Sequence, residues 1–169
     1  MLGAATDYRL QTADYQLEAP VSSAYESADL LLKLYEMRRD PTMRQARNWF
    51  VTFNPDSAEE LSAVMRGEHS AYFRMVTSFW DMAASFVNNG AIDEQMFNDA
   101  NGEHVVVFSK VEPFLAGFRT QLALPQYLGQ LEQLVMRIPN AKERLADTRE
   151  RFRQIAAARA AAAGQAVRA

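Results

Sequence analysis

Residues 69–88 read HSAYFRMVTSFWDMAASFVN and give the strongest helix signal in the sequence. Its apolar side chains recur every three to four residues, which places them on one face of a helix. That face carries Tyr72, Met75, Val76, Phe79, Met82, Ala83, Phe86 and Val87. The following Asn88-Asn89-Gly90 supplies a left-handed helix end. A helix with so wide an apolar face must be covered by other elements.

Two helices are predicted upstream. Ser23 and Glu26 have the spacing of a capping box, which opens a helix over residues 23–39. Its apolar face carries Ala24, Ala28, Leu31, Leu32 and Tyr35. Asp40 and Pro41 end this helix and open the next, as N-cap and first helical residue. That second helix carries Met43, Ala46, Phe50 and Phe53, and Asn54-Pro55 ends it.

Shorter helices are predicted on both sides of residues 69–88. Ser57 and Glu60 repeat the capping-box spacing, and Asp93 caps a helix that ends near Gly102. Pro125 opens a helix, and its apolar residues are Leu128, Leu131, Leu134 and Val135. The last helix begins near Asn140, and its apolar stripe is Leu145, Phe152 and Ile155. Its alanine-rich end has little side chain to bury.

Residues 105–108, Val-Val-Val-Phe, are the one strand-like string. A lone strand cannot satisfy its backbone, and no partner strand is visible in the sequence. A helical stripe also continues through the string to Leu122, so we predict a helix kinked at Pro113. The chain is therefore expected to be all-α, a single bundle of six to eight mostly antiparallel helices without significant sheet. Residues 1–22 are expected to form an extended arm, 23–155 the bundle and 156–169 an exposed helical tail.

Composition narrows the function. The chain has 169 residues, a net charge of −3, two histidines and no cysteine. The missing cysteines exclude disulfides, thiol catalysis and zinc–cysteine sites. The acidic balance disfavours nucleic acid as a partner. No window resembles a signal-peptide core or a membrane span, so a cytoplasmic location is expected.

Charge is unevenly distributed along the chain. Residues 56–112 carry 3 basic and 10 acidic groups, for a net −7, whereas residues 137–169 carry 8 basic and 3 acidic groups, for +5. The preferred explanation is that the basic C-terminal helix lies near the acidic middle. The alternative is an interaction tail for an acidic partner or an anionic surface.

Three strings resemble a known family. They are LYEMRRDP (34–41), FVNNGAID (86–93) and the run 111–119, which precedes a leucine-rich helix. Over residues 23–137 the chain is similar to a family of uncharacterised bacterial all-helical proteins, described as a domain of unknown function. The resemblance implies an all-helical fold. Many members begin with a membrane-spanning helix, which has no counterpart in this sequence, and the family carries no established catalytic residues.

A tripeptide occurs twice at an offset of 35 residues. Gly67-Glu68-His69 and Gly102-Glu103-His104 are each followed by a similar Phe-Val-Phe pattern. If both lie at one end of the bundle, Glu68, His69, Glu103 and His104 can converge on a divalent metal and form a metal-dependent enzyme. Neighbouring residues point about 100° apart on a helix, however, so the favoured interpretation is two ordinary helix starts without a metal.

Two groups of residues are candidates for a ligand or partner surface. Arg38, Arg39, Arg44 and Arg47 flank the Asp40-Pro41 corner, where such a cluster can bind phosphate, although ion pairs on a solvated face explain it as well. Trp49 and Trp80 are the residues expected to edge a pocket or groove.

We therefore expect a binding module that makes protein–protein contacts or self-associates. The alternatives are a small-molecule-binding bundle with an apolar pocket lined by aromatic residues and methionine, and the metal enzyme described above. No cofactor is expected, and catalysis is not favoured because no nucleophile or nucleotide-binding motif occurs.

Overall fold

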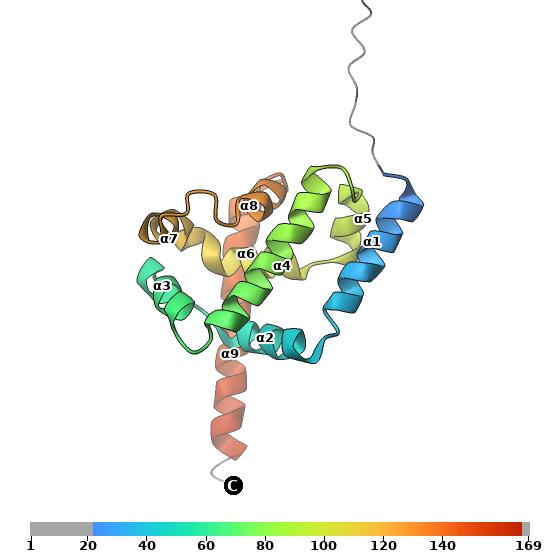
Figure 1. The fold of residues 1–169 in the computed structure, drawn as a ribbon. Helices are drawn as coiled ribbons and strands as arrows, with labels where there is room; N and C mark the ends of the chain where they lie inside the picture. Colours follow the sequence, from blue (N-terminus) through green and yellow to red (C-terminus); the bar gives the residue numbers. More distant parts are fainter. Residues whose placement is uncertain (1–21, 167–169) are drawn as a thin grey trace, which may run out of the picture.

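The helix predicted over residues 69–88 is α4 (Ser70–Asn88), and it crosses the middle of the molecule (Figure 1). The computed structural model describes residues 22–166, so nearly all of the predicted arm 1–22 lies outside the described residues. The buried residues of α4 are Phe73, Val76, Thr77, Phe79, Trp80, Ala83, Ala84 and Val87. Helices α2 (Pro41–Thr52) and α8 (Gly129–Val135) make its most extensive contacts.

Every regular element in residues 22–166 is helical, as predicted. The remaining elements are α1 (Ala24–Met37), α3 (Ala58–Arg66), α5 (Glu94–Ala100), α6 (Glu103–Val111), the 3-10 turn η1 (Glu112–Phe114), α7 (Leu115–Leu122) and α9 (Ala141–Ala166). The strand-like Val105–Phe108 string lies within α6, and η1 interrupts the path to α7 at Pro113, where the kink was predicted. Counted as one kinked helix, α6 to α7 brings the described part of the chain to eight helices, within the predicted range.

The capping residues act much as the sequence predicts. Ser23 and Glu26 form a complete capping box at the start of α1, and Asp40 caps α2 through the amides of Thr42 and Met43. The second box is only half formed. The Ser57 hydroxyl accepts from the Glu60 amide at 3.1 Å, but the Glu60 carboxylate accepts from the amide of Asp56 rather than that of Ser57.

The predicted apolar face of α1 is wrong in part, because Leu32 and Tyr35 are exposed. The core side of α1 instead carries Ser27 and Leu34. The Ser27 hydroxyl accepts from the amide of Asp93 at 3.0 Å, which turns this polar residue inward toward the start of α5. The side of α1 that faces the core therefore combines this hydrogen bond with the apolar contacts of Leu30, Leu31 and Leu34.

Two other apolar predictions need correction. Ile155 on α9 is exposed and Phe152 is half-buried, so the buried stripe of α9 weakens after Leu145. The helix expected from Pro125 begins at Gly129, because Leu128 adopts a left-handed backbone conformation with φ 57°. Arg119 stabilises this turn by donating to the carbonyl of Tyr127 at 2.9 Å.

Helix α9 packs along α6 and α2 and then extends beyond them (Figure 1). Arg137, just before it, pairs with Glu94, while Arg149 and Arg153 on the helix pair with Glu112 and Asp56. The basic C-terminal segment thus lies against the acidic middle of the chain, in agreement with the preferred explanation of the charge pattern. Residues 157–162 of α9 are exposed.

Lys110 on α6 is a buried charge at the end of α2. Its Nζ donates to the carbonyls of Phe50, Val51 and Phe53 at 2.8–2.9 Å. The last carbonyls of a helix have no intrahelical partner, so one ammonium satisfies groups that are otherwise unpaired. Burial lowers the pKa of Lys110 to about 8. The contact fixes α6 to α2 beside the aromatic part of the core.

Candidate functional site

The four arginines singled out in the sequence lie together at the corner between α1 and α2. With Tyr35 they line a hollow of about 240 Å³, the arginine hollow: Arg38, Arg39, Arg44 and Arg47. The helix ends explain the arrangement, because Arg38 and Arg39 follow α1 directly and the other two lie one and two turns into α2. Four cations therefore converge at the corner where the chain passes from α1 to α2.

Glu103 binds two of the arginines that line the hollow, Arg38 and Arg47. Its carboxylate accepts from Arg47 Nε at 2.8 Å and from Arg38 Nη2 at 2.7 Å. Arg38 Nη1 also donates to Asn101 Oδ1 at 3.2 Å. Burial by itself raises the pKa of Glu103, but the hydrogen bonds and charges of Arg47 and Arg38 outweigh it and bring the pKa below its usual value. Glu103 is therefore ionised at neutral pH and positions two of the four guanidinium groups.

The other two arginines, Arg39 and Arg44, make no contact with Glu103. Arg39 lies 3.7 Å from Glu36, and both side chains are largely exposed. Arg44 donates to the backbone carbonyl of Arg39 at 3.4 Å and forms no ion pair with any residue in 22–166. No acidic residue lines the hollow itself. Its potential is therefore positive, and guanidinium groups bind carboxylates and phosphates strongly.

An exposed apolar face adjoins the arginine hollow. Within the described part of the chain, seven large apolar side chains are exposed, and four of them belong to α1: Tyr25, Leu32, Tyr35 and Met37. Tyr25, Leu32 and Tyr35 are spaced by seven and three residues, so they share one side of the helix. We call these three residues the α1 face. Tyr35 belongs to both the α1 face and the arginine hollow, which makes the two surfaces continuous.

Residues 23–138 match the profile of a domain of unknown function, DUF4760. The chain belongs to the DUF4760 family. This confirms the resemblance noted in the sequence over nearly the same residues, and the match spans α1 to α8 with the whole arginine hollow. No curated protein and no solved structure matches the chain. None of the helices described for this DUF4760 chain has the length and apolar character needed to cross a membrane.

The two tryptophans of the DUF4760 domain occupy different depths. Trp80 is only 1% exposed and lies beneath the corner, with the Arg38 guanidinium 5.0 Å from its ring centroid. Trp49 is half-buried and stacks between Phe53 and His69 at 4.9 and 5.0 Å. Trp80 thus supports the arginine hollow from below, whereas neither ring lines it.

The two Gly-Glu-His copies differ in their surroundings. Glu68 is exposed and His69 stacks on Trp49, whereas Glu103 binds two arginines and His104 is buried beside Trp80 and Phe97. Among residues 22–166, no three His, Asp or Glu side chains are grouped closely enough to hold a metal ion. The structure therefore does not gather Glu68, His69, Glu103 and His104 around one point.

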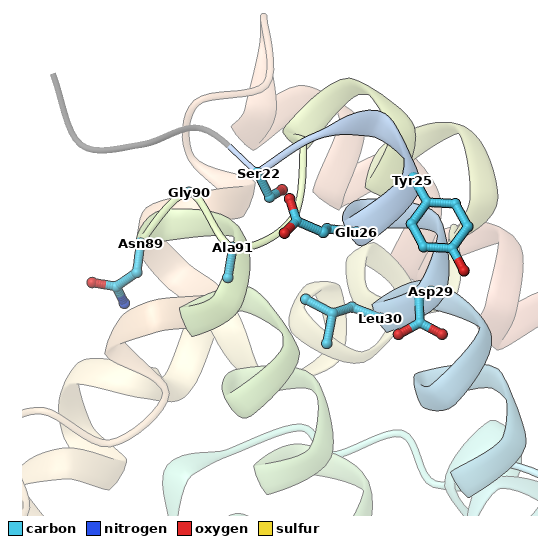
Figure 2. Close-up of a pocket in the computed structure, with 8 residues that line it drawn as sticks. All are labelled: Ser22, Tyr25, Glu26, Asp29, Leu30, Asn89, Gly90 and Ala91. Atoms are coloured by element: carbon cyan, nitrogen blue, oxygen red, sulfur yellow. The ribbon is translucent and has the colours of Figure 1, made fainter.

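Two further hollows lie beside α1. Figure 2 shows the first, between the start of α1 and the turn 89–91. Its carboxylates already have partners, because Glu26 accepts from Ser23 and Asp29 pairs with Lys33 at 2.6 Å.

The second hollow, the methionine groove, has a volume of about 470 Å³ and is lined chiefly by Met37, Met43, Met75, Phe79 and Met82. Methionine content is visible in the sequence, but the fold decides which methionines share a surface.

Proposed function

We propose that this DUF4760 chain is a binding module that recognises an acidic segment of a protein partner at the α1–α2 corner. The arginine hollow takes the carboxylates of the partner, and the α1 face takes its apolar side chains. The observation that carries the proposal is the continuity of these two surfaces through Tyr35.

Charge supports this assignment. Arg38 and Arg47 are prepositioned by Glu103, so little side-chain entropy is lost when an anion binds between them and their neighbours. Arg39 and Arg44 have no strong competing partner among the described residues, and their charges steer an acidic segment toward the corner.

Apolar exposure supports the choice of a protein partner. Three of the four exposed apolar residues of α1 share one side of the helix, although soluble monomers usually bury such stripes. Tyrosine and arginine are also the residue types enriched at the energetic centres of interfaces. A free metabolite would use the hollow but leave the α1 face uncovered.

Fluorescence anisotropy tests the proposal with a defined probe. The probe is a labelled helical peptide with leucines at positions i, i+3, i+4 and i+7 and glutamates at the remaining positions. We expect saturable binding that weakens with added salt. The Arg39→Gln/Arg44→Gln double variant and Leu32→Ser should each weaken binding by about tenfold or more. Arg38 and Arg47 are left intact because they also hold Glu103.

The matched control is Arg74→Gln/Arg151→Gln, which removes two exposed arginines outside the hollow. Equal losses in both double variants would show nonspecific charge attraction and overturn the proposal. A peptide with glutamine in place of glutamate that binds equally well would also overturn it. If sedimentation shows a dimer of the chain that Leu32→Ser dissociates, the α1 face binds a second copy instead of an acidic partner.

The methionine groove favours a second candidate, an apolar small molecule. Methionine side chains adapt to irregular ligands, and four of them with Phe79 line one open groove. Nile red, a neutral apolar dye, tests this candidate. Its fluorescence should rise on binding and be lost in Met75→Lys, while Leu32→Ser leaves it unchanged. No rise in fluorescence with the folded wild type would reject this candidate.

A further inference from the structure

Residues 1–21, which precede the described part of the chain, contain a short internal repeat. The pattern Asp-Tyr-x-Leu occurs at residues 7–10 and again, seven residues later, at residues 14–17. A spacing of seven is the period that keeps equivalent residues on one side of a helix. The segment has three acidic residues and one basic residue, so its side chains carry a net charge of −2. It therefore has the acidic and apolar character that the α1–α2 corner is proposed to recognise.

This segment joins the described structure at the start of α1. The amide of Ser22 donates to the carbonyl of Gly90 at 3.1 Å, and its hydroxyl lies 2.7 Å from that of Ser27. These contacts hold Ser22 beside the turn 89–91 (Figure 2). Pro20 stands two residues earlier, and proline favours a turn. Two antiparallel helices are commonly joined by two to five residues, so a chain that reverses at Pro20 returns alongside α1.

The segment is long enough to reach the arginine hollow. Helix α1 has 14 residues, which correspond to a length of about 21 Å. An extended chain covers up to about 3.3 Å per residue, so Asp14 can reach the corner if the segment is extended. A helical segment rises about 1.5 Å per residue and brings Asp7 to the same place. One aspartate of the repeat therefore reaches the arginines in either conformation.

The α1 face offers the segment an apolar surface. Tyr25, Leu32 and Tyr35 are 82%, 68% and 61% exposed. Two carboxylates of α1 each lie beside a cation, because Asp29 pairs with Lys33 at 2.6 Å and Glu36 lies 3.7 Å from Arg39. The strongest positive charge that an acidic segment meets along this path is therefore at the corner. Apolar contact along α1 and charge at its end match the composition of the repeat.

We infer that residues 1–21 fold back along α1 of the same chain and occupy the α1 face and the arginine hollow. The tyrosines and leucines of the repeat cover the α1 face, and an aspartate accepts from Arg39 and Arg44. The inference rests on the proposed function, because it names a segment that the corner recognises. Attachment to the same chain gives the segment an effective concentration on the order of millimolar, so it competes with an external acidic partner.

Paramagnetic relaxation enhancement in the ¹⁵N-labelled full chain tests this docking. The chain has no cysteine, so Ala13→Cys provides a single site for a nitroxide label inside the segment. We expect the amide signals of residues 35–44 to lose intensity and to recover when ascorbate reduces the nitroxide. The same label at Ala161→Cys, on the exposed end of α9, is the control and should leave these signals unchanged.

Two double variants in the labelled chain separate docking from simple proximity. Asp7→Asn/Asp14→Asn removes the aspartates of the repeat and should restore most of the lost intensity. Gln11→Asn/Gln16→Asn changes neutral residues of the same segment and should restore none. Equal intensities in both variants would overturn the inference. Signal loss in an unlabelled ¹⁵N chain mixed with spin-labelled ¹⁴N chain would assign the segment to a second copy and overturn docking within one chain.

The helical peptide described under the proposed function distinguishes the two proposals. If residues 1–21 occupy the corner, Asp7→Asn/Asp14→Asn should strengthen binding of that peptide by about threefold or more. Unchanged peptide affinity without any loss of intensity at residues 35–44 would overturn the inference and leave the proposed function intact. A segment that docks while the peptide fails to bind even this double variant would overturn recognition of an external partner and support the inference.

Discussion

His104 is a buried imidazole that gives the stability of this protein a defined pH dependence. Its pKa is about 4 in the folded chain against 6.5 for an ordinary histidine. As the pH falls below 6.5, the unfolded chain binds the proton first, so folding free energy is lost progressively down to pH 4. The difference between the two pKa values corresponds to about 3 kcal/mol.

Urea denaturation at pH 7.5 and pH 4.5 measures this effect. Carboxylates also titrate in this range, so the informative quantity is the difference between the wild type and His104→Phe. We expect the variant to lose less stability on acidification, because it has no imidazole to protonate. Identical pH dependence in both proteins would place the pKa of His104 near its ordinary value.

The two glutamates of the repeated tripeptide provide a matched pair at the scale of single residues. Glu103 bridges Arg38 and Arg47, whereas Glu68 is exposed. Glu103→Gln leaves two neighbouring guanidinium groups without an anion and should cost about 1–3 kcal/mol. Glu68→Gln should stay within about 0.5 kcal/mol. Chemical denaturation compares them, and equal costs would mean that the Glu103 bridge contributes nothing to stability.

Sequence similarity between the two copies did not predict this difference. Both have the same three residues and the same following apolar pattern, yet one histidine is buried and the other stacks on the surface of Trp49. The partners of Glu103 lie 56 and 65 residues away along the chain. Contacts at such separation depend on how the helices cross, and local spacing carries no information about that.

Among the elements, α4 was the most predictable and α1 the least. The stripe of α4 is wide and strongly periodic, so one helical period predicts that the helix exists. Its buried side is rotated from the predicted one: Phe73, Thr77, Trp80 and Ala84 are buried, whereas the predicted Tyr72, Met75, Met82 and Phe86 are only partly buried. Helix α1 has leucines and tyrosines around most of its circumference, and its core side includes the polar Ser27, which accepts from the amide of Asp93. The sequence therefore predicts that α1 is a helix, and the exposed α1 face becomes visible only in the fold. The arginines were found early because they flank a turn that Asp40-Pro41 already marks.

Deleting the C-terminal end of α9 should destabilise the protein less than removing the aromatic ring of Phe152 on the same helix. Residues 157–162 are exposed, so deleting residues 157–169 should change the melting temperature by no more than about 2 °C. Phe152 is half-buried, with Lys110 Nζ 5.8 Å from its ring centroid. Phe152→Ala should therefore cost about 1–2 kcal/mol, less than a fully buried phenylalanine.

Thermal denaturation of the two variants checks this order. A shortened chain that unfolds would show that the alanine-rich end packs into the core. A salt-dependent loss of peptide binding on deletion would instead support the alternative of a basic interaction tail.

For the whole molecule, the helix signals in the sequence were sufficient to predict an all-α fold. They were not sufficient to predict which hollows form between the helices. Capping residues and prolines separate the chain into helices, and the lack of a partner strand excludes a sheet. The arginine hollow and the methionine groove each combine residues from at least two helices. Their existence depends on packing between helices, which a single sequence without relatives does not determine.

The three lysines of the chain divide into one buried and two exposed amines. Lys33 and Lys142 meet solvent, whereas Lys110 is covered while it binds the end of α2. An acylating reagent should therefore label the exposed Lys33 and Lys142 readily. Labelling of Lys110 should require that α6 separates from α2, although its lowered pKa leaves more of the amine unprotonated at neutral pH. Peptide mass spectrometry over time would then report how often this part of the core opens, and equal rates at all three lysines would contradict the contact.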